Sequence, residues 1–340
     1  MARLVREWAA VPPGWTWLVG VALYAVLALP TCGRATELAR PDSWLALLAV
    51  PAAVVLRARP VASGSALVVG GVWLRVVFAS FGQASDQIVV GQAAAELVLA
   101  GGNPYGHGYE QTTPPGSPFP YGPLALLWSP LGVTGEIVAA AGTMALMAWA
   151  RTFVVLGAYA SFWVVVDLSM SGLNDVTPGF LIAAGLLALR HHPVLGGSLL
   201  ALAGAYKPYA LAWAPAAFGF GGPATIAAFL VTAAAVWSPL LVWGLPSFVR
   251  SIELAQATHP LPESTLNVPE LRILAVPIAV ASLFARRWWL VVASGTAIFF
   301  VVLFLDRWAS IGYYLAVVPI AGIALEMAVR DRLALNATPA

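Results

Sequence analysis

The chain of 340 residues is apolar and carries little charge: 60% of its residues are hydrophobic and 9% are charged, against about 25% charged in a typical soluble domain. So few polar side chains cannot cover the surface of a soluble protein of this length, and the mean hydropathy of +0.85 likewise indicates that lipid solvates the chain. The formal net charge of +2 argues against a nucleic-acid partner, and the single cysteine, Cys32, excludes a disulfide framework and a cysteine-based zinc site.

Apolar runs between charges and turn residues predict helices along the whole chain, because about 20 apolar residues cross the hydrocarbon core of a membrane. The runs lie at 15–31, 44–56, 61–81, 133–150, 152–168, 176–190, 194–206, 209–219, 224–243, 269–285, 288–305 and 308–327. We therefore predict an all-α polytopic membrane protein with about twelve transmembrane segments (roughly 10 to 13), in a single domain over 1–340.

The basic residues predict which side of the membrane each connection faces. With the N-terminus inside, ten of the seventeen basic residues fall on the cytoplasmic side, and most carboxylates fall outside. The first run follows Arg3 and Arg6, and the poor cleavage site at 29–32 favours a retained anchor over a cleaved signal peptide. Sixteen of the basic residues are arginine, which is typical of a GC-rich bacterial genome. We predict a multi-pass protein of a bacterial plasma membrane with both termini cytoplasmic.

Residues 194–219 allow two interpretations. One is a single helix with Lys207 at its centre, which would move Arg286 and Arg287 to the outside. The other is a pair of short helices that turn at Lys207-Pro208. Pro208 lacks the N–H that a continuous helix would use there, so we predict the hairpin, which also keeps the two arginines inside.

Two polar stretches, 82–122 and 244–268, are too long to be simple connectors, and both are extracytoplasmic on this map. The first contains Asp86, an amphipathic stretch over 92–99, Gly101-Gly102-Asn103-Pro104-Tyr105 and Phe119-Pro120-Tyr121-Gly122-Pro123. Such aromatic rings and amides suit a sugar, because the rings stack on C–H faces and the amides bind hydroxyls. The alternative is an ordered loop on the membrane whose aromatic side chains are interface anchors.

The order of these motifs resembles a known family. An Asp soon after a span, Gly-Gly-Asn-Pro-Tyr and a Phe-x-Tyr-x-Pro entry into the next segment are followed by Ser171-Gly172-Leu173-Asn174-Asp175 and by a small-residue helix ending in Lys207-Pro208. Over about 84–220 this resembles the polyprenyl-phosphate-mannose-dependent mannosyltransferases of the GT-C superfamily (glycosyltransferase family 87). Gly122 stands where the family usually has a proline, and Ser171-Gly172 replaces its usual Gly-Gln, so the resemblance is to a divergent member.

The resemblance implies a GT-C-like bundle with long extracytoplasmic loops that carry the active site. It also implies an inverting transfer of a sugar, mannose, from a polyprenyl-phosphate donor to a lipid-linked or cell-envelope glycan acceptor. Asp86 would be the general base, with a helix-capping Asp as the alternative. Lys207, the only lysine, would bind the donor phosphate, or else be a residue that snorkels to the interface. Arg307 would be a second phosphate ligand, or else the ion-pair partner of Asp306.

The resemblance and the outer position of the loops also suggest which side chains contact the substrates. These are Asn103, Tyr105, Tyr121, Asn174, Asp175 and His259. Asn174 and Asp175 precede a predicted helix, so they could instead cap it. Arg75 lies inside the third span, and we expect it to pair with Glu96 or Asp167.

No spacing of His, Asp and Glu gives a convincing metal site, so we expect no cofactor to be required, although Asp86 and other outer carboxylates could converge on a divalent metal. Two other functions stay open, a transporter or flippase of a lipid-linked glycan and a non-catalytic membrane scaffold. A transporter is expected to show matching broken helices in two halves and polar residues along a path through the midplane. The polar residues here gather on one face instead.

Overall fold

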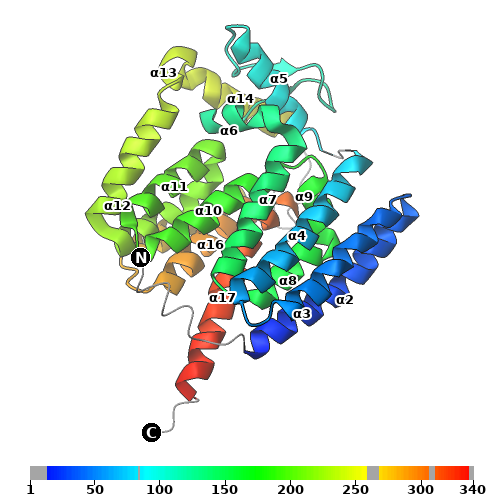
Figure 1. The fold of residues 1–340 in the computed structure, drawn as a ribbon. Helices are drawn as coiled ribbons and strands as arrows, with labels where there is room; N and C mark the ends of the chain where they lie inside the picture. The colour runs from blue at the N-terminus through cyan, green and yellow to red at the C-terminus, as the bar shows by residue number, and fades with distance from the viewer. Residues whose placement is uncertain (1–13, 83–84, 259–267, 306–310, 337–340) are drawn as a thin grey trace. The chain divides into compact units, whose positions relative to one another are not determined.

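The computed structural model describes residues 14–82, 85–258, 268–305 and 311–336, and these residues are almost wholly helical (Figure 1). The β-structure among them is one short antiparallel pair, β1 (Gly108–Tyr109) with β2 (Ser117–Pro118). Four described helices are long and apolar enough to cross a membrane: Trp15–Glu37, Pro60–Phe81, Pro123–Trp149 and Pro208–Trp237. The chain is therefore an all-α membrane protein.

The exterior of the described helices is apolar, as lipid solvation requires. Side chains as large as Leu241 (89% exposed) and Val55 (81% exposed) face outward. Five charged side chains of the described residues are buried, namely Arg75, Glu136, Asp175, Lys207 and Glu326. An ionised group inside a membrane protein needs specific partners, so these five mark the places where polar interactions organise the fold.

The described chain forms two compact units, of which the first comprises Met1–Gln83, Ile137–Ser171 and Gly322–Ala340. Its elements include α2 (Trp15–Glu37), η1 (Pro41–Leu48), α3 (Ala49–Val55), α4 (Pro60–Phe78), η2 (Ala79–Phe81), α8 (Phe153–Ser161) and α9 (Trp163–Met170), with parts of α7 (Gly132–Trp149) and α17 (Tyr314–Asn336). Helices α2 and α8 pack closely because glycines face each other: a Cβ at Gly157 would overlap the carbonyl oxygen of Gly20. Small residues at the contact allow the two backbones to approach.

Arg75 stabilises the break between α8 and α9, which meet at an angle of 60° at Phe162. Its guanidinium donates to the carbonyl oxygens of Tyr159 (2.9 Å) and Ala160 (3.3 Å), and it lies 4.9 Å from the Tyr159 ring centroid. The last carbonyls of a helix have no partner within the helix, and a cation there also complements the helix dipole. The expected carboxylate partner of Arg75 is therefore corrected to backbone carbonyl groups.

Helix α8 is also capped at its other end by a buried charge. The carboxylate of Glu326, on α17, accepts hydrogen bonds from the backbone N–H groups of Val154 (3.3 Å) and Val155 (2.9 Å). The first N–H groups of a helix lack intrahelical acceptors, and no water is present in a bilayer core to replace them. In the first unit, two buried ionisable side chains thus form hydrogen bonds with the free backbone groups at both ends of α8.

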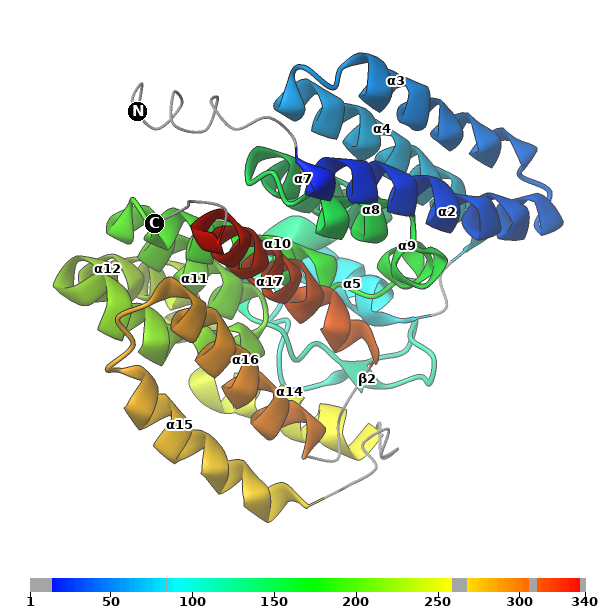
Figure 2. The same ribbon diagram turned by 90° about the horizontal axis from the view of Figure 1, so that it is seen from below.

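The second unit comprises Ala84–Glu136 and Gly172–Ala321. Its elements include α5 (Gln87–Leu99), α6 (Pro123–Trp128), η3 (Ser129–Leu131), α10 (Val176–Leu189), α11 (Pro193–Tyr206), η4 (Pro208–Trp213), α12 (Ala214–Trp237), α13 (Leu240–Trp243), α14 (Leu245–Thr258), η5 (Pro269–Leu274), α15 (Ala275–Ser282), α16 (Trp288–Phe304) and η6 (Ile311–Tyr313). Figure 2 shows α10, α11, α12 and α16 as neighbouring helices of this unit.

Residues 194–219 do not form one continuous helix. Helix α11 ends at Tyr206, Lys207 is extended (φ −133°, ψ 122°), and Pro208 begins the 3-10 turn η4. A second break follows inside α12, where Gly222 has the non-helical angles φ 66° and ψ −158°. The predicted break at Lys207-Pro208 is therefore present.

Side-chain contacts show that the chain reverses twice between α11 and the second half of α12. The hydroxyl of Thr225 donates to the carbonyl oxygen of Pro193 (3.2 Å), and the hydroxyl of Thr232 donates to the side-chain hydroxyl of Ser198 (3.0 Å). From the first pair to the second, the residue number increases in both segments, so the two segments run parallel. Two reversals, at Lys207 and at Gly222, are needed to connect them.

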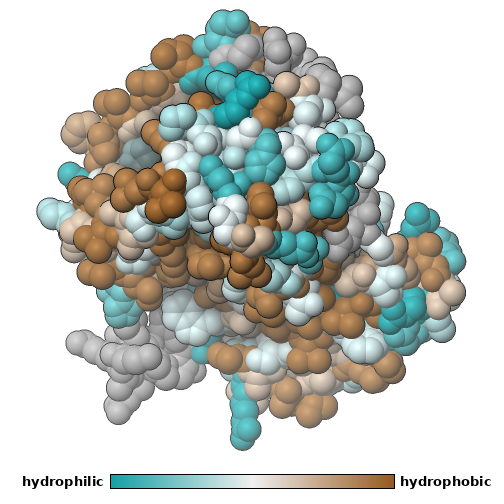
Figure 3. Space-filling view, turned by 90° about the horizontal axis from the view of Figure 1, so that it is seen from above, coloured by the Kyte–Doolittle hydropathy of each residue, from teal (hydrophilic) through white to brown (hydrophobic). Residues whose placement is uncertain are grey.

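The long polar stretches are partly helical and pack on each other within the second unit. The first contains α5 and the β1–β2 pair, and the described part of the second is mainly α14. Phe248 of α14 packs against Tyr105 (ring centroids 5.3 Å apart) in a buried cluster that includes Phe119. Figure 3 shows a view from above, in which hydrophilic residues lie between hydrophobic ones.

Candidate functional site

Four separate stretches of the chain meet at one end of the helices of the second unit. They are the start of α5 with Asp86 and Gln87, the segment before α6 with Tyr121, the segment before α10 with Asn174 and Asp175, and the break after α11 with Lys207. Main-chain hydrogen bonds join these stretches: Ile88 N donates to Gly172 O (3.2 Å), and Gly122 N donates to Tyr206 O (3.1 Å). The backbone therefore holds the site residues together independently of their side chains.

Lys207 and Asp175 form a buried ion pair at the centre of this site. Lys207 Nζ lies 2.7 Å from Asp175 Oδ1, and the two side chains are 4% and 0% exposed. The ammonium also donates to Gln87 Oε1 at 3.1 Å. The alternative that Lys207 snorkels to the interface therefore does not apply, because Asp175 neutralises its charge inside the protein.

Three tyrosine rings surround the ammonium of Lys207. Its Nζ lies 5.0 Å from the ring centroid of Tyr121, 5.7 Å from that of Tyr209 and 6.0 Å from that of Tyr313. The negative faces of aromatic rings attract a cation, most strongly where water is excluded. The local sequence explains the placement of Lys207, since a residue before proline disfavours the helical region and the chain leaves α11 at this point.

Two carboxylate oxygens of the site are buried and make no hydrogen bond. They are Asp175 Oδ2 and Asp86 Oδ2. Asp175 Oδ1, in contrast, accepts from Lys207 and from the hydroxyl of Tyr209 (2.6 Å). Asp86 and Asp175 precede α5 and α10, but neither side chain makes a capping hydrogen bond. The alternative of a helix-capping Asp therefore does not describe either side chain.

Tyr121 links the two aspartates electrostatically. Burial raises the pKa of Tyr121 well above its ordinary value, and the negative charges of Asp175 and then Asp86 raise the pKa further. The phenol therefore stays neutral, and it can donate a hydrogen bond to an anion or a sugar hydroxyl. The aromatic residue predicted to contact substrate thus lies directly beside the ion pair.

Glu136 belongs to this region although the motifs did not single it out. It lies on α7 and is 1% exposed. Its Oε2 accepts from the backbone N–H groups of Val176 and Thr177 (both 3.1 Å), and its Oε1 accepts from the hydroxyls of Thr177 (2.6 Å) and Tyr206 (3.4 Å). The signal in the sequence was a lone carboxylate in the apolar run 133–150, and an ionisable residue inside a span is by default a functional candidate.

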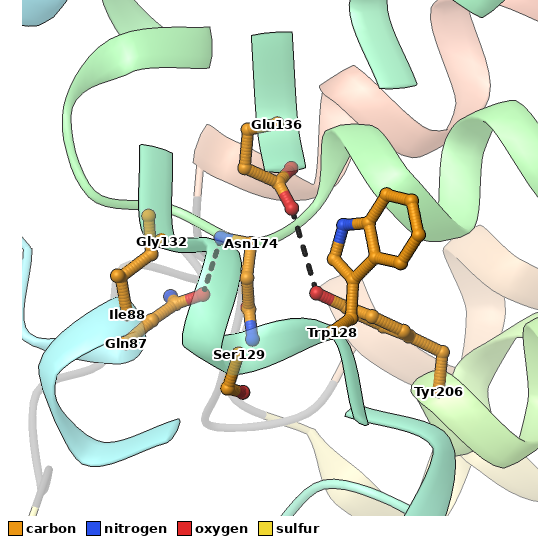
Figure 4. A pocket seen from close by; sticks show the side chains of 8 residues that line it. All are labelled: Gln87, Ile88, Trp128, Ser129, Gly132, Glu136, Asn174 and Tyr206. Atoms are coloured by element: carbon orange, nitrogen blue, oxygen red, sulfur yellow. Dashed lines mark hydrogen bonds between the residues drawn. The ribbon is translucent and has the colours of Figure 1, made fainter. Parts of the chain in front are cut away.

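A small polar pocket opens beside Glu136, with room for about one water molecule (Figure 4). It is lined by Gln87, Ile88, Trp128, Ser129, Gly132, Glu136, Asn174 and Tyr206. Two of these side chains carry buried polar atoms without a hydrogen bond, the donor Nε1 of Trp128 and the acceptor Oδ1 of Asn174. Asn174, predicted to bind substrate, therefore turns a free acceptor toward the interior.

Asn103 and Tyr105 hold the first polar stretch together. Asn103 Nδ2 donates to the carbonyl oxygen of Trp243 (2.8 Å), and its Oδ1 accepts from the backbone N–H of Tyr105 (3.0 Å). Tyr105 is 2% exposed, and its hydroxyl donates to the carbonyl oxygen of Tyr121 (3.1 Å). The polar atoms of both side chains thus make hydrogen bonds within the fold, and Tyr105 is buried.

The glycine at position 122 has a structural reason. A Cβ at this position would overlap the carbonyl oxygen of Ala205 on α11. A proline would in addition lose the N–H that binds Tyr206 O. Gly122 thus permits the close approach of the α6 entry to the end of α11, directly before Lys207.

The remaining predicted site residues, Arg307 and His259, lie outside the described residues. Within the part of the chain that the structure describes, no group of three or more His, Cys, Asp or Glu side chains could hold a metal ion. No protein-family model, no curated protein and no solved structure matches the chain. The site itself is therefore the basis for assigning a function.

Proposed function

We propose that the protein is a GT-C-like membrane glycosyltransferase that transfers a sugar, mannose, from a polyprenyl-phosphate donor to a lipid-linked or cell-envelope glycan. The observation that carries this proposal is the cluster of Asp86, Asp175 and Lys207 with Tyr121 at one end of the helices. It combines carboxylates with free oxygens, one cation and an aromatic surface. A sugar phosphate and an acceptor hydroxyl require these groups.

The positions of the charged residues support the orientation map of about twelve segments. The stretches around Asp86, Asp175 and Lys207 come from connections that the map assigns to the outside, and these stretches meet at one end of the second unit. At connections that it assigns to the cytoplasm, Arg286 donates to Gly219 O (2.5 Å), and Arg190 lies 5.1 Å from the Trp288 ring centroid. We therefore propose an extracytoplasmic site in a bacterial plasma membrane with both termini in the cytoplasm.

The chemistry assigns one role to each charged side chain. The acceptor oxygen forms a bond to the anomeric carbon of the donor sugar, while the bond from that carbon to the phosphate oxygen breaks and its electron pair leaves with the polyprenyl phosphate. Asp86 takes the proton of the acceptor hydroxyl as general base. Lys207 stabilises the charge of the departing phosphate. Tyr121 and Asn174 position the sugar.

Donor binding at Lys207 requires a local rearrangement. The ammonium has three N–H donors, of which one points to Asp175 and one to Gln87, so a third remains for a phosphate oxygen. Because Lys207 is buried, the phosphate reaches it only when the surrounding tyrosine rings move. Asp175 then holds the ammonium at the correct position while the phosphate is bound.

The test is sugar transfer by the purified protein in lipid vesicles, with labelled polyprenyl-phosphate mannose and isolated envelope glycans as acceptors. Removal of a general base lowers the rate by about 10²- to 10⁴-fold, so the Asp86→Asn variant should lose nearly all transfer. The Lys207→Ala variant should chiefly raise the KM for the donor. Full transfer by Asp86→Asn would refute the role of Asp86, and movement of the donor across the bilayer without transfer would indicate a flippase.

A further inference from the structure

Glu136 contacts the elements that carry both members of the central ion pair. Two of its hydrogen bonds come from the N–H groups of Val176 and Thr177, which directly follow Asp175. A third comes from the hydroxyl of Tyr206, which directly precedes Lys207 (Figure 4). One buried carboxylate thus joins the start of α10 to the end of α11.

The start of α10 has a specific need for such an acceptor. Its first N–H groups have no partner within the helix, and the side chain of Asp175 makes no capping bond because it faces Lys207 instead. The pocket beside Glu136 has room for about one water molecule, whereas the carboxylate accepts from two of these N–H groups, and a negative charge at a helix N-terminus is favourable. Glu136 therefore takes over the capping that frees Asp175 to bind Lys207.

We propose that Glu136 is a positioning residue, which keeps Asp175 and Lys207 paired at the site without contacting substrate itself. Without its carboxylate, the α10 start and the α11 end lose their common anchor, and the ammonium of Lys207 becomes accessible. The consequence for catalysis rests on the proposed function, since it assumes that Lys207 binds the donor phosphate. The greater accessibility of Lys207 does not rest on the proposed function.

The chain offers a matched control in Glu326. Its buried carboxylate also accepts two backbone N–H groups at the start of a helix, those of Val154 and Val155 of α8. It belongs to the other unit, whereas Glu136 belongs to the unit that contains the site. Substitutions at Glu136 and Glu326 remove the same kind of interaction, so a general loss of stability should be similar in both.

The first readout uses the fact that Lys207 is the only lysine in the chain. The full-length protein in detergent micelles is treated with an amine-acetylating reagent well below its unfolding temperature, and acetylation of Lys207 is followed by peptide mass spectrometry. Loss of hydrogen bonds to buried groups corresponds to roughly 10- to 100-fold in an equilibrium constant, so Glu136→Leu should raise the acetylation rate by at least about tenfold. Glu326→Leu should leave the rate within about twofold of the wild type.

Equal acetylation rates in Glu136→Leu and Glu326→Leu would overturn the positioning role. If Glu136→Leu does not fold, Glu136→Gln decides, because the amide keeps the shape and one acceptor oxygen while it removes the charge and the second acceptor. Its acetylation rate should lie above that of the wild type, and a rate equal to that of Glu326→Gln would overturn the proposal.

The second readout separates this inference from the proposed function. In the transfer assay Glu136→Gln should raise the KM for the polyprenyl-phosphate donor about tenfold, while Glu326→Gln leaves it unchanged when activity is corrected for folded protein. A KM unchanged by Glu136→Gln in an active enzyme would refute the effect on donor binding. If Glu136→Leu exposes Lys207 but the wild type transfers no sugar, the proposed function alone is refuted.

Discussion

The Asp175→Asn variant tests whether the central ion pair is charged and buried. The substitution keeps the size of the side chain but removes the anion that lies 2.7 Å from Lys207 Nζ, where the two side chains are 0% and 4% exposed. Gln87 and the tyrosine rings remain, but none of them carries the negative charge of a carboxylate. Removal of one partner of a buried ion pair leaves an uncompensated charge and typically costs about 3–5 kcal/mol. We expect a loss of this size in the free energy of unfolding.

The assay is denaturant-induced unfolding in detergent micelles, followed by tryptophan fluorescence, in a double-mutant cycle with Lys207→Met. Each single variant leaves one charge without its partner, whereas the double variant Asp175→Asn/Lys207→Met leaves none. The loss in the double variant should therefore be smaller than the sum of the two single losses by roughly 1–3 kcal/mol. Additive losses, or a loss below about 1 kcal/mol for Asp175→Asn, would refute the buried charged pair.

Three further predictions follow from single contacts. Arg75→Leu should lower the unfolding temperature because the carbonyl of Tyr159 loses its donor at a cost of about 1–3 kcal/mol, and Arg75→Lys should restore part of the loss. Gly122→Ala should destabilise by about 1–3 kcal/mol in the same assay, since its Cβ would overlap the backbone of Ala205; an unchanged stability would contradict this packing. Burial raises the pKa of Tyr121, so the folded state holds its proton where the unfolded state, with a pKa near 10, has lost it. The contribution of Tyr121 to the free energy of unfolding is therefore complete below about pH 10 and is lost as the pH rises above 10. The stability of Tyr121→Phe should fall less steeply with alkaline pH than that of the wild type. Equal slopes of stability against pH would contradict the raised pKa.

Local physical chemistry made the helices predictable. Each predicted apolar run is mainly helical in the described residues, because hydrocarbon leaves a backbone no other way to satisfy its polar groups along a single segment. The break before Pro208 was predictable from the proline itself, because proline lacks an N–H and disfavours a helical conformation at Lys207. These features depend on residues that are neighbours in the sequence.

Partners between distant residues were not predictable in this way. Arg75 was expected to meet a carboxylate but binds carbonyl groups, and the hydrogen bond from Asn103 to the carbonyl oxygen of Trp243 was not expected. Composition shows that a buried charge needs a partner. Every residue has a backbone carbonyl oxygen, however, so the sequence does not show which carbonyl becomes that partner. Only the packing of helices decides which carbonyl comes within reach.

The sequence by itself determined that this is an all-α membrane protein, that its charges are few, and that a helix breaks at Lys207-Pro208. The tertiary structure alone decided that Lys207 is neutralised by Asp175, and that Glu136 rather than Asp175 caps α10. The physical reason is the range of the interactions involved. Hydropathy and proline act over a few residues, whereas an ion pair inside an apolar protein forms only where folding brings distant segments within about 3 Å.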